Sequence, residues 1–312
     1  MAYIQIEAPD ALSMNEALDQ AFAKFNCEPL GGPSEDGWSK MGDLQRCPYR
    51  YYLKNELGAV AIDPMDNNLK IRNPTALEVG SLFHAILAVH YGRRLPAGYP
   101  GWRANMPNPL DFLQAVEDAG ASIEHVRQVK RMYYSYSEYW GPELDLQPLA
   151  VEMSAGIPGI HTCRFDMLAY EDGGIWNIEH KSASAFTPDV LESWWLDGEV
   201  IGQFYAWDLS EMSKMFGAPL TGTKINLTSK GFPPRHMRVE IVQPREVVST
   251  FARDRVFWND LRTRYRNAGY WPRSLAGCMN RYDRCAFWTH CRDLNNDLVR
   301  IVPKKLPGAD AL

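Results

Sequence analysis

The stretch from Pro148 to Lys181 constrains the fold more than any other part of the chain. Hydrophobic and polar residues alternate over Leu149–Met153, Thr162–Tyr170 and Gly174–His180, which is the period of half-buried strands. The last two runs are separated by a Glu-Asp-Gly-Gly turn at 171–174, a sequence suited to joining adjacent antiparallel strands. The sequence therefore predicts a hairpin around which the rest of the chain must be built.

Helical patterns precede and follow this hairpin, and two more strands lie between the later helices. The predicted helices cover about Ala76–Tyr91, Leu110–Tyr139, Pro188–Phe216 and Arg245–Ala268, and the two strands lie near Lys224–Thr228 and Met237–Val242. This order predicts a mixed α/β fold with a central sheet flanked by helices.

The length of 312 residues fits one elaborated domain, which we divide into four parts. A turn-rich stretch at Gly31–Gly37 ends the first of them. The parts are an N-terminal arm or cap (1–38), a helical region (39–147), the sheet-containing core (148–268) and a cysteine-rich C-terminal segment (269–312).

Composition limits the partners and the location of the protein. Hydrophobic residues make up 46% and charged residues 23%, as in ordinary globular proteins. The formal net charge of -5 gives no overall attraction to nucleic acid, so such a partner would have to be held by a local groove. No stretch approaches the ~18 apolar residues of a membrane span, and Met1–Ser13 lacks the pattern of a signal peptide. We therefore expect a cytoplasmic protein with no membrane partner.

Three residues of the predicted hairpin carry chemistry: Asp166, Glu179 and Lys181. Side chains alternate along a strand, so Glu179 and Lys181 share a face and the hairpin can bring Asp166 beside them. Oxygen ligands of this kind suit Mg²⁺, which can polarise a phosphate and activate water, and a lysine can stabilise the developing charge. Taken alone, the same trio would also fit a solvated face with a weak ion pair.

Four of the six cysteines form the other candidate site. Cys278, Cys285 and Cys291 lie close together, and Cys47 lies far upstream. In the cytoplasm clustered cysteines are better explained as metal ligands than as disulfides, and four thiolates can enclose a 4Fe-4S cluster or a zinc ion. The missing C-x-x-C knuckle favours iron-sulfur over zinc. Zinc with His290, or buried cysteines that never meet, are the alternatives.

The pattern that predicts DNA-binding residues is less specific. Arg255, Arg262 and Arg266 fall near one face of the predicted helix before the cysteines, where they could hold phosphates or form a solvated face. Tyr205 could stack on an unpaired base or belong to the core.

The order Asp166, Glu179-x-Lys181 resembles the D…(D/E)-x-K signature of the PD-(D/E)XK nucleases. The surroundings resemble the RecB-like branch, which includes CRISPR-adaptation exonucleases. Glu78–His84 is similar to the histidine motif that precedes the sheet in that branch, and Gly202–Trp207 is similar to its glutamine-led motif. The resemblance implies a restriction-endonuclease-like central mixed sheet flanked by helices, with the N- and C-terminal segments joined by a four-cysteine metal site.

The resemblance also assigns roles to the matched residues. Those implied to bind Mg²⁺ or Mn²⁺ are His84, Asp166, Glu179 and the backbone carbonyl of His180. Lys181 would act in catalysis with the two carboxylates, Gln203 would position the lysine or DNA, and Glu152 would assist from the preceding strand. Two departures weaken the Gln203 assignment: Cys163 stands where the family has a glycine, and Trp207 where it has a tyrosine.

The cysteines match a layout of that branch, with one cysteine before the nuclease core and three after it around a 4Fe-4S cluster. The function implied is a metal-dependent DNA exonuclease acting on DNA ends or single strands, in recombination, repair or phage- and CRISPR-related DNA processing. A protein partner in a recombination or adaptation complex would be consistent with it. The alternative is a non-catalytic DNA-end-binding or scaffold subunit.

Overall fold

The structure is a computed structural model that describes residues 13–27, 34, 36–61, 74–141, 146–278, 285–293 and 299–301. Much of the N-terminal arm predicted over 1–38 lies outside the described residues, including residues 1–12 and most of the turn-rich stretch. The same is true of the chain beyond Ile301.

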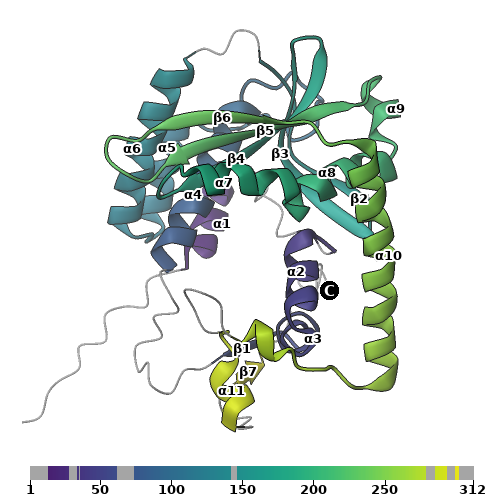
Figure 1. Cartoon of the computed structure of the whole chain (residues 1–312). Helices are drawn as coiled ribbons and strands as arrows, with labels where there is room; N and C mark the ends of the chain where they lie inside the picture. Colours follow the sequence, from purple (N-terminus) through teal and green to yellow (C-terminus); the bar gives the residue numbers. More distant parts are fainter. Residues whose placement is uncertain are drawn as a thin grey trace, which may run out of the picture.

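A five-stranded mixed sheet forms the centre of the molecule (Figure 1). Its strands are, in spatial order, β2 (Gln147–Ile157), β3 (His161–Glu171), β4 (Gly174–Ala183), β5 (Leu220–Ser229) and β6 (His236–Ile241). Strands β4 and β5 are parallel, and the other neighbours are antiparallel. The predicted mixed α/β architecture with a central sheet flanked by helices is confirmed.

The β3–β4 hairpin has the turn that the sequence predicts. Asp172 and Gly173 both have positive φ, 51° and 78°, which is the conformation that matches the twist of adjacent antiparallel strands. Glu171 therefore pairs with Gly174, and Met167 pairs with Ile178 further along the hairpin.

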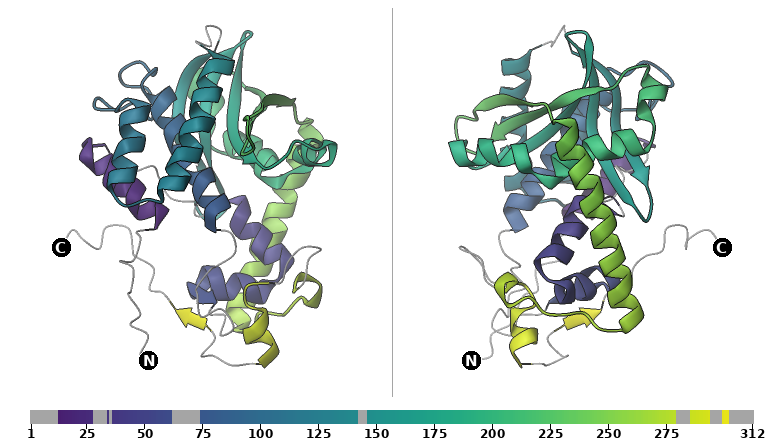
Figure 2. Two further views of the ribbon diagram at one scale, coloured as in Figure 1. Left: turned by 90° about the vertical axis from the view of Figure 1, so that its left-hand side faces the viewer. Right: turned by 45° about the vertical axis from the view of Figure 1, so that its right-hand side comes forward.

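Helices cover both faces of the sheet. On one face, α4 (Pro74–Gly92) packs against β2, β3 and β4 and is itself covered by α1 (Met14–Lys24), α5 (Pro109–Asp118) and α6 (Ile123–Trp140), as Figure 2 shows. On the other face lies α8 (Gly198–Leu209). The largest apolar core lies on the α4 side, and α1, predicted as part of an arm, contributes Phe22 and Ala17 to it. Among the described helices, none combines the length and the hydropathy needed to cross a bilayer.

The helix predicted over Leu110–Tyr139 is in fact two helices, α5 and α6. Gly120, between them, has a φ of +97°, which a helix interior does not tolerate, and α6 begins after Ser122. The apolar period continues across the break because both helices face the same core. Periodicity alone could not reveal the turn.

The helix predicted over Pro188–Phe216 is also divided. It comprises α7 (Pro188–Ser193), a 3-10 turn at Trp194–Leu196, α8, and α9 (Met212–Phe216). Asp197 causes the main break, because its side chain caps α8 by accepting hydrogen bonds from the amides of Glu199 (2.7 Å) and Val200 (3.4 Å).

Segments from the two ends of the chain assemble at one end of the molecule (Figure 1). The N-terminal part comprises α2 (Trp38–Arg46), α3 (Pro48–Tyr51), a π-helical turn (Tyr52–Glu56) and β1 (Ala59–Ala61). The C-terminal part comprises a 3-10 turn (Leu275–Gly277), α11 (Trp288–Asp293) and β7 (Val299–Ile301), and it is reached through α10 (Arg245–Ala268). Strand β1 pairs antiparallel with β7, and the rings of Tyr51 and Tyr52 stack on Trp271.

Candidate active site

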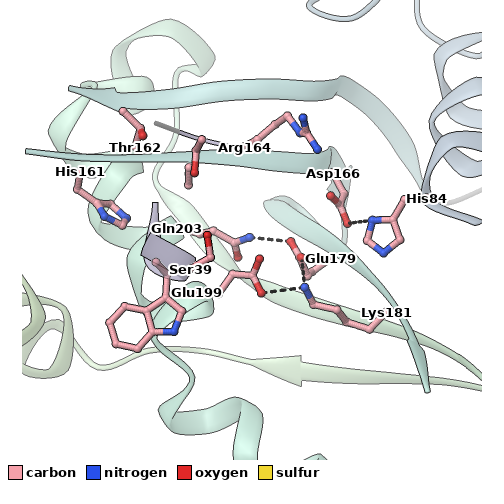
Figure 3. Close-up of a pocket in the computed structure, with 13 residues that line it drawn as sticks. Ser39, His84, His161, Thr162, Arg164, Asp166, Glu179, Lys181, Glu199 and Gln203 are labelled. Atoms are coloured by element: carbon pink, nitrogen blue, oxygen red, sulfur yellow. Dashed lines mark hydrogen bonds and ion pairs between the residues drawn. The ribbon is translucent and has the colours of Figure 1, made fainter. Parts of the chain in front are cut away.

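A cavity of about 230 Å³ lies beside β3 and β4, between α4, α8 and the start of α2 (Figure 3). Most of the residues that line it have polar side chains: Ser34, Trp38, Ser39, His84, His161, Thr162, Cys163, Arg164, Asp166, Glu179, Lys181, Glu199 and Gln203. The residues of all four matched motifs therefore reach one cavity.

Each functional side chain is placed by its own element. Asp166 comes from β3, Glu179 and Lys181 come from alternate positions of β4, and Gln203 comes from the face of α8 that packs on the sheet. His84 reaches the cavity from α4, on the other side of Asp166 (Figure 3). Strand alternation accounts for the pair on β4, whereas the two helical residues are brought in by packing.

Asp166 is the centre of one half of the site. Its Oδ2 lies 3.3 Å from Nδ1 of His84 and accepts a hydrogen bond of 2.9 Å from the backbone amide of His180. Burial works to raise the pKa of Asp166, but the neighbouring His84 outweighs it, and the pKa is lowered. The pKa of His84 is raised in turn, since the Asp166 carboxylate outweighs the effect of burial.

Glu179 is the centre of the other half. Nζ of Lys181 lies 2.7 Å from its Oε1, and Nε2 of Gln203 donates a hydrogen bond of 2.6 Å to its Oε2. Asn177 donates to Oε1 of Gln203 at 2.7 Å, which fixes the orientation of the glutamine amide. Burial and the nearby Asp166 carboxylate raise the pKa of Glu179 to about 8. Two buried carboxyl groups so close together are stabilised in their charged forms by a nearby positive charge.

Sequence reasoning missed Glu199. Its Oε2 lies 2.8 Å from Nζ of Lys181, so the lysine is held between two carboxylates. Burial works against the charged form, but Glu179 and Glu199 outweigh it and raise the pKa of Lys181. A signal was present, because Glu199 precedes Gln203 by four residues and so shares its helix face.

Glu152 lies on β2 across from Asp166 and has an unusual backbone. Its φ of +53° is rare for a residue other than glycine, and such strain is found disproportionately at functional sites. The sheet pleat changes at this point: Val151 faces the α4 core, whereas Ala155 faces the α8 core. Glu152 pairs with Arg164 at 2.6 Å, and burial together with Asp166 raises the pKa of Glu152 to about 7.

The two departures from the family pattern have a packing explanation. Cys163 and Trp207 are both buried in the core between the sheet and α8, where Trp207 stacks on Phe216 and meets Phe165 edge-on. Tyr205 is half-buried beside His161 and Phe251, with ring centroids 5.6 and 6.0 Å away. The structure thus gives Tyr205 a packing role and leaves its predicted base contact untested.

Within the part of the chain that the structure describes, no three His, Cys, Asp or Glu side chains are already drawn together as a metal site. In the active-site cavity the reason is visible: Glu179 turns toward Lys181 and Gln203, while Asp166 turns toward His84 (Figure 3). All three predicted side-chain ligands nevertheless line the same cavity. Carboxylate and imidazole donors facing a small polar cavity are a suitable set for Mg²⁺ or Mn²⁺.

The four predicted cluster ligands line a second cavity, of about 260 Å³, at the end of the molecule where the two chain ends meet. They are Cys47, Cys278, Cys285 and Cys291. Arg50, Arg273 and Arg292 line the same cavity, and burial raises the pKa of the Cys291 thiol to about 11. The structure brings the cysteines around one space without gathering their sulfur atoms at one point. His290 bonds to Tyr49 rather than lining the cavity.

The structure corrects the predicted row of DNA-facing arginines. Arg255 and Arg262 are only 2% and 9% exposed. Arg255 donates to the backbone carbonyls of Asp36 and Ile160, and Arg262 donates to the Asp36 carboxylate at 3.0 Å. Arg266 pairs with Glu56. Helix periodicity placed these residues on one face correctly, but at Arg255 and Arg262 that face is turned inward toward α2 and the β2–β3 turn. Arg266 is exposed, and its contact with DNA stays a prediction.

A mixed sheet with two acidic side chains and a lysine of one hairpin in a single cavity is an arrangement suited to cleaving phosphodiester bonds with a divalent cation. A sequence model of the PD-(D/E)XK nuclease superfamily matches residues 38–292, and the chain belongs to that superfamily.

Two crystal structures show low similarity to the chain. A "putative exonuclease" from Eubacterium rectale aligns over 98% of this chain and 96% of its own, with 12% identity and a TM-score of 0.42. The structure of SSO0001 aligns over 55% of this chain and 74% of its own, with 10% identity and a TM-score of 0.23. No protein with a curated description matches the sequence.

Proposed function

We propose that the protein is a metal-dependent DNA exonuclease, which hydrolyses phosphodiester bonds at DNA ends. The observation that carries the proposal is the cavity in which His84, Asp166, Glu179 and Lys181 meet. Superfamily membership supports a nuclease, and the paired buried carboxylates support the need for a divalent cation. The resemblance to the RecB-like branch extends the proposal to end processing in recombination, repair or phage- and CRISPR-related pathways.

The chain's own residues divide the work. Asp166, Glu179 and His84 would hold Mg²⁺ or Mn²⁺ together with the carbonyl of His180. When bound, the ion would supply Lewis-acid activation of water and phosphate. Lys181 presents an ammonium group to the reacting phosphate, where it stabilises the charge that develops. Gln203 orients Glu179 through its hydrogen bond of 2.6 Å, and Glu199 holds Lys181 in place in the free protein.

We propose that the four cysteines hold a 4Fe-4S cluster rather than zinc, as the resemblance to the RecB-like branch implies and the missing C-x-x-C knuckle favours. All four line one cavity, and three arginines of the same cavity supply positive charge for an anionic group. The cluster would join the N-terminal and C-terminal segments, and its role would be structural.

The proposal is tested by incubating purified protein with labelled linear and circular DNA, with Mn²⁺ or with EDTA. Linear DNA should be degraded only in the presence of the metal, and Lys181→Ala should lower the rate by about 10³-fold. Lys214→Ala is the matched control, since that exposed lysine lies outside the cavity and pairs with Glu211, three residues before it. Equal residual degradation by wild type and Lys181→Ala would remove the enzyme and leave the scaffold alternative.

A further inference from the structure

The tip of the β5–β6 hairpin, Lys230–Arg235, lies against the end of the catalytic strand. The backbone amide of Lys230 donates to the carbonyl of Ala183 at 2.8 Å. Ala183 is two residues beyond Lys181 on β4, a distance of about 7 Å along a strand. Gln128 of α6 donates to the carbonyl of Lys230 at 3.1 Å. The tip is therefore fixed between α6 and the strand that carries the catalytic lysine (Figure 1).

Side-chain contacts hold the hairpin firmly. His236, where β6 begins, bonds to Ser135 of α6 at 2.8 Å and to Thr228 of β5 at 3.1 Å. Inside the loop, Ser229 donates through its amide to the carbonyl of Arg235 at 2.8 Å, and the amide of Arg235 donates to the Ser229 hydroxyl at 2.7 Å. The side chains that the tip exposes are thus presented in fixed positions.

The exposed side chains are aromatic and basic. Phe232 is 82% exposed, although its ring would be more stable in the interior. The guanidinium group of Arg131 lies 5.9 Å from its ring centroid, and that of Arg235 lies 5.5 Å from the ring of Phe186. Arg127 and Lys130 are exposed on α6 near Arg131. We call Arg127, Lys130, Arg131, Phe232 and Arg235, together with the partly buried Phe186, the hairpin-tip surface.

We propose that the hairpin-tip surface binds the unpaired strand of a DNA end and leads it toward Lys181. This inference rests on the proposed function, because it names how the same site receives its substrate. Exposed arginines bind phosphates, and an exposed ring stacks on a base. In a duplex the base faces are covered by neighbouring base pairs, so Phe232 selects an unpaired strand. Because the chain has a net charge of -5, it has no overall attraction to nucleic acid, and a local group of four cations indicates where phosphates would bind.

The test measures equilibrium binding of a labelled single strand and of a duplex of the same sequence, in EDTA so that no hydrolysis occurs. Phe232→Ala should weaken single-strand binding about tenfold without changing its salt dependence. Arg131→Gln/Arg235→Gln should weaken it and reduce the slope of log affinity against log salt by about 1.4. Duplex binding should change little in either variant.

Matched controls lie on the exposed side of α10. Phe257→Ala removes a ring that is 60% exposed, and Arg253→Gln/Arg264→Gln removes two exposed cations. These variants should bind like wild type, and unchanged melting temperatures verify the fold of all four proteins. Hairpin-tip variants that match these controls overturn the proposal. So do equal losses on single strand and duplex, which would indicate a backbone-binding patch.

Hydrolysis assays separate this proposal from the proposed function. If Lys181→Ala abolishes DNA hydrolysis but the hairpin-tip variants hydrolyse and bind DNA like wild type, only the proposal for the hairpin-tip surface is wrong. Protein that binds single strands through Phe232 but never hydrolyses them supports the surface and overturns only the nuclease.

Discussion

The active-site cavity and the cysteine cavity are built in different ways. The first is lined by side chains from strands and long helices, and its charged groups already pair with one another, as Asp166 does with His84 and Lys181 with Glu179. The second is lined by cysteines from turns and short helices. Their nearby partners are backbone groups such as those of Ser274, which lies next to Cys47 and Cys278.

The difference shows what each site needs in order to exist. Regular strands position the Asp166 site whether or not an ion is present, because sheet hydrogen bonds and the α4 and α8 cores hold it. The cysteine site lies between an N-terminal and a C-terminal segment, and it would gain its main stabilisation from the proposed cluster, which would close the loop between them. We therefore expect substitutions in the active-site cavity to lower the nuclease rate, and substitutions in the cysteine cavity to lower the free energy of unfolding.

The largest expected effect is that of Cys47→Ser. Loss of the proposed cluster, which would close a very long loop, should lower the free energy of unfolding by about 5 kcal/mol, while the folded fraction keeps its nuclease rate within a few-fold. Denaturant titration, iron analysis and DNA hydrolysis measure the three quantities. Cys27→Ser is the control, since that buried thiol lies in the α4-side core, outside the cysteine cavity, and bonds to the carbonyls of Phe25 and Asn105. If the variant loses its iron but keeps the wild-type free energy of unfolding, the expected contrast between the two cavities is wrong.

Next comes Arg262→Met, which alters the helix that connects the two regions. Without the guanidinium, the buried Asp36 carboxylate loses its cationic partner, so the free energy of unfolding should fall by about 3 kcal/mol. Arg264→Met, at an exposed position of the same helix, should have little effect. The double variant Asp36→Asn/Arg262→Met should recover part of the loss in thermal denaturation. Additive losses would contradict this pairing.

A smaller effect is expected from Gln203→Leu, which sharpens the comparison within the active site. It replaces the amide with an apolar group of similar size and removes the hydrogen bond to Glu179, so hydrolysis should slow by about 10- to 100-fold. The buried Asn177 amide loses its acceptor as well, so the melting temperature should also fall. Gln114→Leu, which removes only a surface contact with Asp118, should retain the wild-type rate. A loss of stability without a loss of rate would assign Gln203 to packing.

The smallest effect is a pH dependence that belongs to neither site. Burial, with help from Arg94 and Arg93, lowers the pKa of His90 to about 4, against an ordinary value near 6.5. The folded protein therefore binds fewer protons than the unfolded chain, so this contribution is present above pH 6.5 and is lost as the pH falls toward 4. Between pH 7 and 5 the free energy of unfolding should drop by about 1 to 2 kcal/mol through His90. His90→Gln should flatten that part of the profile.

Local sequence signals determined the sheet and half of the candidate site. Alternation and the Asp172-Gly173 turn predicted the β3–β4 hairpin, and strand geometry then placed Glu179 and Lys181 on one face. These features depend on residues close in sequence, whose relative positions the backbone itself dictates.

Only the tertiary structure decided which helix faces point inward and which distant residues meet. Arg255 and Arg262 have the spacing of a surface row, yet they bind Asp36 in the interior. Glu199 reaches Lys181 because α8 packs across the sheet, and Phe232 reaches Arg131 because the β5–β6 hairpin lies on α6. Periodicity shows which residues share a helix face, but packing between segments far apart in the chain decides what covers that face.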